Sequence, residues 1–143
     1  AGGELPGWDA AGTGIGVSDN SDVWNFGLPT VDGDPAVFLQ GDGAITRLLS
    51  GLLAGTEYEV SWSELRRACS PAICGSTVPQ PNRLLVVLDE GLESEIVLDG
   101  PRFVLDATVW STATAEFTAA KPAYTLTFRS ADAGDRTFLI DQI

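Results

Sequence analysis

Residues 35–62, which read PAVFLQGDGAITRLLSGLLAGTEYEVSW, decide the predicted fold of the chain. This stretch has three short apolar runs separated by two glycine-rich turns, GDG and AGT. In the last run Tyr58, Val60 and Trp62 alternate with Glu and Ser residues. A period of two is typical of a strand that packs one face on a core, so we place the aromatic side inward. We predict that the three runs form an antiparallel meander that nucleates a β-sandwich.

The remainder of the chain also reads as short strands. Residues 83–89, RLLVVLD, are the most apolar run, and their composition predicts a central strand buried on both faces. Residues 93–99 and 102–106 flank a Gly-Pro dipeptide, which predicts a turn between two paired strands. No segment has a convincing helical period, and about ten short strands separated by turn signals are typical of an all-β protein. We therefore predict a single domain over residues 1–143, built as an antiparallel β-sandwich.

The charge of the chain excludes several classes of partner. The 143 residues carry a formal net charge of -12, and Lys121 is the only lysine. Such a chain could neutralise few phosphates, so we expect no nucleic acid partner and no attraction to anionic membranes. No apolar run approaches the ~20 residues of a membrane helix, so we expect no membrane insertion. The charge fits a divalent cation, a neutral partner or a salty exterior, or else a surface kept charged for solubility.

The histidine and cysteine content narrows the chemistry further. The chain has no histidine, which excludes Ser-His-Asp and Cys-His catalysis and every histidine–metal site. Its two cysteines, Cys69 and Cys74, lie in one proline-containing loop, ACSPAICG. We predict a local disulfide between them, which indicates an oxidising, extracytoplasmic setting. The alternative is a pair of free thiols in a cytosolic loop.

Three stretches resemble a known family. LPGW near the start, the stretch at 35–62, and AYTLTFRS with GDRTFLIDQI at the end resemble the galactose-binding-domain-like jelly rolls, which include many bacterial carbohydrate-binding modules. The resemblance implies a jelly-roll β-sandwich in a secreted or cell-surface protein that is usually non-catalytic. Family members usually have an opening strand with a Phe-Glu pair, and their last strand runs further. We therefore expect that this domain lacks the family's first strand, which is either cut away or supplied by a neighbouring chain.

The resemblance also implies a structural calcium ion. Asp141 matches the acidic residue of the family's final strand, and Ca²⁺ takes hard oxygen ligands. Other loop aspartates are available to complete the site, and those that we expect to do so are Asp135, Asp34 and Asp32. The alternative is that these aspartates are solvated turn residues.

A polar loop and the strands beside it provide a candidate sugar site. Sugars present apolar C–H faces and hydroxyl rims, so a site needs an aromatic platform with amides and charged groups nearby. Trp24 is the expected platform, because it lies in a long polar loop. The residues that we expect to bind the sugar are Trp24, Asn25, Asn20, Gln40, Arg67 and Trp110. Trp110 is ambiguous, because Val109 and Trp110 fall on opposite faces of their strand.

Several other aromatic and basic residues are more typical of a core. Tyr58, Trp62 and Trp8 are expected to pack inside rather than to bind ligand. Arg47 has the parity of the apolar positions on its strand, so it is either paired with a carboxylate or lines the groove, and pairing is the commoner arrangement. Tyr58, Trp62 and Trp8 are therefore left out of the predicted sugar site.

The sequence therefore predicts a secreted, non-catalytic module that binds a polysaccharide or glycan and carries a structural calcium. No spacing among the 20 acidic residues selects a catalytic carboxylate pair, so we do not expect an enzyme. The alternative function is a self-assembling extracellular structural subunit of a fibre or surface layer. In that alternative a homo-oligomer forms through an open sheet edge, by strand addition and calcium.

Overall fold

The structure is a computed structural model, and it describes residues 7–18, 36–66, 83–104, 109–132 and 137–143. These residues contain strands and no helix. In chain order the strands are β1 (Asp9–Ala11), β2 (Ile15–Ser18), β3 (Ala36–Gln40), β4 (Ala44–Leu49), β5 (Glu57–Arg66), β6 (Arg83–Leu88), β7 (Ile96–Phe103), β8 (Ser111–Thr118), β9 (Tyr124–Ser130) and β10 (Thr137–Asp141).

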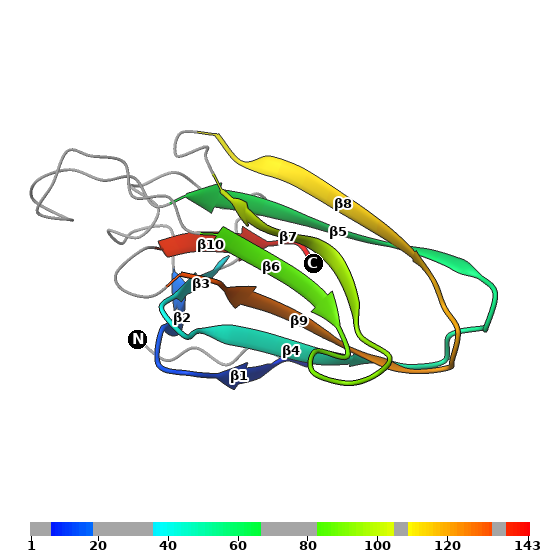
Figure 1. Cartoon of the computed structure of the whole chain (residues 1–143). Helices are drawn as coiled ribbons and strands as arrows, with labels where there is room; N and C mark the ends of the chain where they lie inside the picture. Colours follow the sequence, from blue (N-terminus) through cyan, green and yellow to red (C-terminus); the bar gives the residue numbers. More distant parts are fainter. Residues whose placement is uncertain (1–6, 19–35, 67–82, 105–108, 133–136) are drawn as a thin grey trace, which may run out of the picture.

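The strands form two five-stranded sheets (Figure 1). Sheet A has the order β1-β4-β9-β6-β7, and sheet B has the order β2-β3-β10-β5-β8. All of the pairings between neighbouring strands are antiparallel. The predicted fold class, an all-β antiparallel sandwich of the jelly-roll type, is therefore confirmed.

The predicted meander over residues 35–62 is wrong. Its three runs are strands, but β3 and β5 lie in sheet B while β4 lies in sheet A. The turn at residues 41–43 therefore carries the chain from one sheet to the other. The backbone is tightly packed there, because a Cβ on Gly43 would lie 2.2 Å from the carbonyl oxygen of Gly14. Asp42 fixes the turn by accepting hydrogen bonds from the backbone and hydroxyl of Thr13, and these bonds lower the pKa of its carboxyl.

The space between the sheets is filled by aromatic and aliphatic side chains from both. Trp62 is 1% exposed and meets Phe128 of the opposite sheet edge-on, with ring centroids 5.2 Å apart. Phe117 and Tyr124 make a similar contact at 5.6 Å. Trp62 is therefore a core residue, as predicted. β6 is buried on both faces, as its composition predicts.

The predicted turn at the Gly-Pro dipeptide is wrong, because β7 runs through it. Asp99 pairs with Val86 and Arg102 with Leu84, so Gly100 and Pro101 together lie opposite Leu85, and the strand contains a bulge of one extra residue before it continues. Gly100 makes the bulge possible: its φ is +83°, and a Cβ there would lie 2.2 Å from the carbonyl oxygen of Leu84. Because β7 is the edge strand of sheet A, the proline costs it no essential hydrogen bond.

One ion pair joins the two sheets through the interior. Glu64 of β5 is 7% exposed in its side chain, and both of its oxygens accept hydrogen bonds from the Arg102 guanidinium of β7, at 2.6 and 2.7 Å. The Trp62 indole N–H also donates to Glu64, at 2.9 Å. Asp99 accepts from Arg102 Nε at 2.8 Å. The bonds to Glu64 raise the pKa of Arg102, so its guanidinium stays charged at neutral pH.

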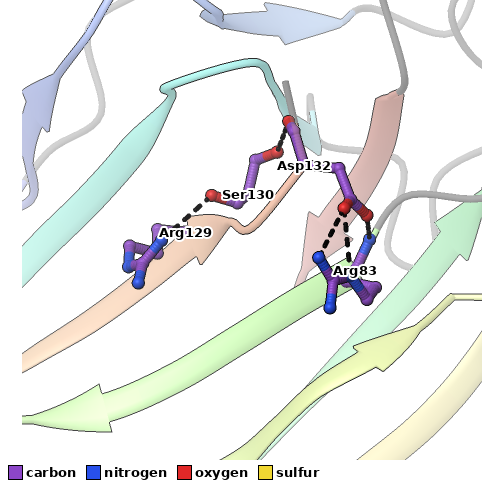
Figure 2. Close-up of polar contacts among 4 residues, drawn as sticks. All are labelled: Arg83, Arg129, Ser130 and Asp132. Atoms are coloured by element: carbon purple, nitrogen blue, oxygen red, sulfur yellow. Dashed lines mark hydrogen bonds and ion pairs between the residues drawn. The ribbon is translucent and has the colours of Figure 1, made fainter. Parts of the chain in front are cut away.

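A second ion pair, between Arg83 and Asp132, holds the start of β6 to the chain that follows β9 (Figure 2). Asp132 accepts from the backbone N–H of Arg83 at 2.8 Å and from its guanidinium at 2.8 and 3.0 Å. Ser130 Oγ donates to the backbone carbonyl of Asp132 at 3.1 Å, which fixes the turn that carries this carboxylate. Both carboxylate oxygens of Asp132 are therefore used within the fold.

Replacing Arg102 with methionine should lower the free energy of unfolding by ~3–5 kcal/mol, because it leaves the buried Glu64 carboxylate without a counter-charge. Urea unfolding followed by tryptophan fluorescence measures the change. Arg129→Met is the matched control: its partner Glu90 is 35% exposed, so the loss should be at most ~1 kcal/mol. Equal losses in the two variants would show that the Glu64–Arg102 pair contributes no more to the free energy of unfolding than the exposed Glu90–Arg129 pair does.

Candidate functional site

The structure describes part of the site that the sequence predicts. Gln40, Trp110 and Asp141 lie within the described residues. The other candidates lie outside them, namely Trp24, Asn25, Asn20 and Arg67 for the sugar, Asp135, Asp34 and Asp32 for calcium, and Cys69 and Cys74 for the disulfide. The metal and disulfide assignments therefore stay predictions.

The three described candidates share one surface, the outer face of sheet B. A small apolar cluster on this face contains only sheet B residues, and Trp110 packs against it. Gln40 has the same parity on β3 as the cluster residue Phe38, and its side-chain oxygen accepts a hydrogen bond from the hydroxyl of Thr137 at 2.5 Å. Asp141 has the same parity on β10 as Thr137 and is 9% exposed. The pairing of strands thus brings together residues that are far apart in the sequence.

A row of polar side chains continues from Trp110 along β5 and β8. On the inner face of this strand pair Tyr58, Val60 and Trp62 lie opposite Phe117 and two alanines. The alternate residues must therefore face outward. We call them the polar track, and its cross-strand pairs are Ser63–Thr112, Ser61–Thr114, Glu59–Glu116 and Glu57–Thr118. All of its members except Ser63 are exposed.

The polar track has the chemistry of a sugar-binding surface. Trp110 precedes Thr112 by two residues on the same face, a rise of about 7 Å along an extended strand. A partly exposed indole can stack on the apolar face of a sugar ring. Hydroxyl and carboxylate groups beyond it can donate to and accept from sugar hydroxyls. The track is therefore an aromatic contact followed by rows of hydrogen-bonding groups on a regular spacing.

Sequence reasoning found one end of the track and missed the rest. Trp110 was a candidate, but Thr112, Thr114 and Glu116 were not. A signal for them exists in residues 111–117, STATAEF, where alanine and phenylalanine alternate with threonine and glutamate. The same alternation in residues 57–62 led us to predict only that the glutamate and serine side chains face outward, with no role in binding. The information that was lacking is that the two strands are neighbours.

A separate cleft of about 480 Å³ opens between the sheets, on the inner side of β5. It lies where β10 ends: Asp141 is the last β10 residue to pair with β5, opposite Ser63, while β5 extends a further six residues to Glu57. Leu49 of β4 and Leu126 of β9 line the cleft from sheet A, and Tyr58 and Val60 line it from sheet B.

The aromatic rings in this cleft are already engaged within the fold. Tyr58 packs against Phe117 with ring centroids 5.9 Å apart, and its hydroxyl accepts from the Leu53 N–H at 2.9 Å. The guanidinium of Arg47 lies 5.8 Å from the ring centroid of Trp8. No described carboxylate pairs with Arg47, so of its two expected arrangements the groove-lining one is observed. The walls of the cleft are mixed, because aliphatic side chains lie beside aromatic rings and beside the polar Arg47, Ser50 and Glu59. Since its rings already make contacts within the fold, we consider the exposed polar track the better candidate for a sugar site.

The described residues do not by themselves form a metal site. No group of three or more acidic or cysteine side chains is found among them. Asp141 accepts a hydrogen bond from the backbone N–H of Gln142 at 2.9 Å, and Asp132 is held by Arg83. A calcium ion at Asp141 would therefore need oxygen ligands from residues beyond the described ranges. Within those ranges there is also no helix that could cross a membrane.

Comparisons with known proteins agree with the fold. No protein-family model matches the sequence, and no curated protein matches it. Sixty-three chains of solved structures are similar. The CBM22-1 xylan-binding domain from Paenibacillus barcinonensis Xyn10C has a TM-score of 0.61 and 18% identity, over 98% of this chain and 85% of that one. TmCBM61 in complex with β-1,4-galactotriose has a TM-score of 0.53 and 15% identity, over 97% and 87%.

A third similar structure shows how such a fold occurs within a larger chain. It is the CBM22-1–GH10 portion of Clostridium thermocellum Xyn10B complexed with xylohexaose, with a TM-score of 0.60 and 18% identity. The match covers 94% of this chain and 25% of that chain. The fold is thus a jelly-roll β-sandwich of the kind seen in these carbohydrate-binding modules. The neighbours do not favour the alternative of a self-assembling structural subunit.

Proposed function

We propose that this chain is a non-catalytic carbohydrate-binding module whose ligand lies on the polar track beside Trp110. The observation that carries the proposal is the exposed row of hydroxyl and carboxylate pairs next to a partly exposed indole, on one face of a sheet. The jelly-roll neighbours support it, because the proteins named among them bind xylan or galactotriose. The ligand is a polysaccharide or glycan, and the module is secreted or displayed at the cell surface.

The carboxylates on the track suit binding better than catalysis. Glu59 and Glu116 lie directly opposite each other and are both exposed. A catalytic acid at neutral pH needs burial or a close like charge to keep its proton, and solvent weakens both effects. Exposed carboxylates instead accept hydrogen bonds from sugar hydroxyls. The absence of histidine from the sequence removes the commonest general base.

A structural calcium with Asp141 as one ligand is the second part of the proposal. Asp141 supports it as a nearly buried carboxylate at the end of β10, on the same face as the track. A carboxylate taken out of water is stabilised by a cation. Asp135, Asp34 and Asp32 are the proposed further ligands of this calcium ion. Separately, we propose a disulfide between Cys69 and Cys74.

Trp110→Ala should weaken binding of the glycan that an array identifies by about 5- to 150-fold, since an aromatic contact with a sugar contributes ~1–3 kcal/mol. Titration calorimetry measures the affinity. Thr114→Arg should also weaken binding, because it fills the track without changing a buried residue. Phe103→Ala is the matched aromatic control, because Phe103 is 48% exposed on the other sheet. The proposal fails if neither track variant changes the affinity, or if Phe103→Ala weakens binding equally.

Removal of calcium should lower the melting temperature, because an ion that binds only the folded state stabilises it. Scanning calorimetry with and without chelator measures the shift. Asp141→Asn should lower the melting temperature and abolish the response to added calcium. If metal-free protein melts at the same temperature with and without calcium, the domain has no structural calcium site.

A further inference from the structure

The polar track on the outer face of β5 and β8 carries its negative charge at one end. Glu59 and Glu116 lie directly opposite each other, and Glu57 lies two residues from Glu59 on the same face. All three residues are exposed. Carboxylates directly opposite each other on neighbouring strands repel and are destabilising. The pairs nearer to Trp110 each join a serine to a threonine and carry no charge.

No described cation shares this face with the three carboxylates. Arg66 has the parity of the core residue Trp62 on β5, so it is directed inward. Arg47 lines the cleft between the sheets, and it makes no ion pair with Glu59, although Glu59 borders that cleft too. The other basic residues that the structure describes pair with carboxylates elsewhere in the fold, namely Arg83, Arg102, Lys121 and Arg129. A counter-charge for the track therefore has to come from outside the described residues.

A ligand ammonium group fits this end of the track better than a metal ion does. Ca²⁺ takes six to eight oxygen ligands, and the described residues contain no group of three acidic or cysteine side chains. An ammonium group needs only three acceptors, because it has three N–H donors. Glu59 and Glu116 can each accept one of these hydrogen bonds, and a hydroxyl of the adjacent Ser61–Thr114 pair can accept the third. Hydrogen bonds between ionised partners are stronger than those between neutral ones.

Acidic side chains alone do not define a site, but Trp110 is an independent indication of a ligand on the same face. Its indole packs against the outer apolar cluster of sheet B and remains partly exposed. Glu116 follows Trp110 by six residues, a rise of roughly 20 Å along an extended strand. A chain of several sugar rings can therefore contact the indole at one end and the carboxylates at the other, whereas a single sugar cannot.

We propose that the polar track binds a glycan with free amino groups, and that one ammonium group of this glycan lies between Glu59 and Glu116. The inference rests on the proposed function and specifies the charge of the ligand. A neutral glycan would leave the repulsion between the two carboxylates in place, and a glycan of uronic acids would add to it. Trp110 contributes affinity for any sugar ring, whereas Glu59 and Glu116 determine which glycan is preferred.

Two oligosaccharides of equal length test the proposal with the full chain. One is β-1,4-linked glucosamine and the other is β-1,4-linked N-acetylglucosamine, so that acetylation removes the charge. Titration calorimetry at a slightly acidic pH, which keeps the amino groups protonated, should show about fivefold tighter binding of the glucosamine oligomer, the upper range for an exposed ion pair. This preference should shrink in about 1 M salt, where the screening length falls to ~3 Å.

Matched substitutions distinguish the track from the overall charge of the protein. Glu116→Gln should reduce the fivefold preference to about twofold, and Glu116→Gln together with Glu59→Gln should abolish it, because each removes one ionised acceptor. Glu93→Gln is the control, since Glu93 is exposed between β6 and β7 and makes the same change in net charge. It should leave the preference intact. The control is needed because a chain with a net charge of -12 attracts any polycation.

Two results would overturn this inference without overturning the sugar site. One is equal affinity for the two oligomers, with both weakened by Trp110→Ala. The other is a preference that Glu93→Gln lowers as much as Glu116→Gln does, because the attraction would then come from the whole surface. Absence of binding to both oligomers would also overturn it, and absence of binding to every glycan on an array would overturn the proposed function as well.

Discussion

The buried pair of Glu64 and Arg102 determines how the two sheets face each other. It ties β5 of sheet B to the edge strand β7 of sheet A, and the Trp62 indole shares the same carboxylate. Because Trp62 and Glu64 are held inward, the residues between and beside them must face outward. The position of the polar track on the outer face follows directly. A register slip of one residue would bury the hydroxyls and expose the tryptophan, so this ion pair protects the surface that we assign to binding.

The length of β5 relative to its neighbours produces two distinct surfaces. β5 has ten residues and β10 has five, so among the described strands β5 has two neighbours near its end, at residues 63 and 64, and β8 alone along residues 57–62. Its outer face presents regularly spaced polar groups that are open to solvent. Its inner face borders a cleft whose walls are partly aliphatic, partly aromatic and partly polar. The pair of β5 and β8 thus contributes to both surfaces, and residues outside the strands, such as Trp8 and Trp110, complete them.

Local patterns predicted which residues form strands and which side of each strand is buried. Trp62 at 1% exposure and the burial of β6 from Leu84 to Leu88 follow from alternation and composition alone. What these patterns could not supply is the partner of each strand. The stretch that was read as a meander divides between two sheets, and the Gly-Pro turn is a bulge within β7, because both depend on contacts with chain segments that are distant in sequence. The threonines of the track were missed for the same reason, since they form a surface only when β8 lies beside β5.

The bulge in β7 also has a consequence for solubility. An exposed edge strand is a template on which other chains can add and aggregate, and proteins protect such edges with prolines and bulges. β7 is the edge of sheet A and exposes Val97 and Phe103, which are 52% and 48% accessible. Pro101 removes a backbone donor between them, and the bulge at Gly100 and Pro101 breaks the regular hydrogen-bond ladder that an incoming strand would need. At high protein concentration the domain would thereby remain dispersed along this edge, although its side chains there are apolar.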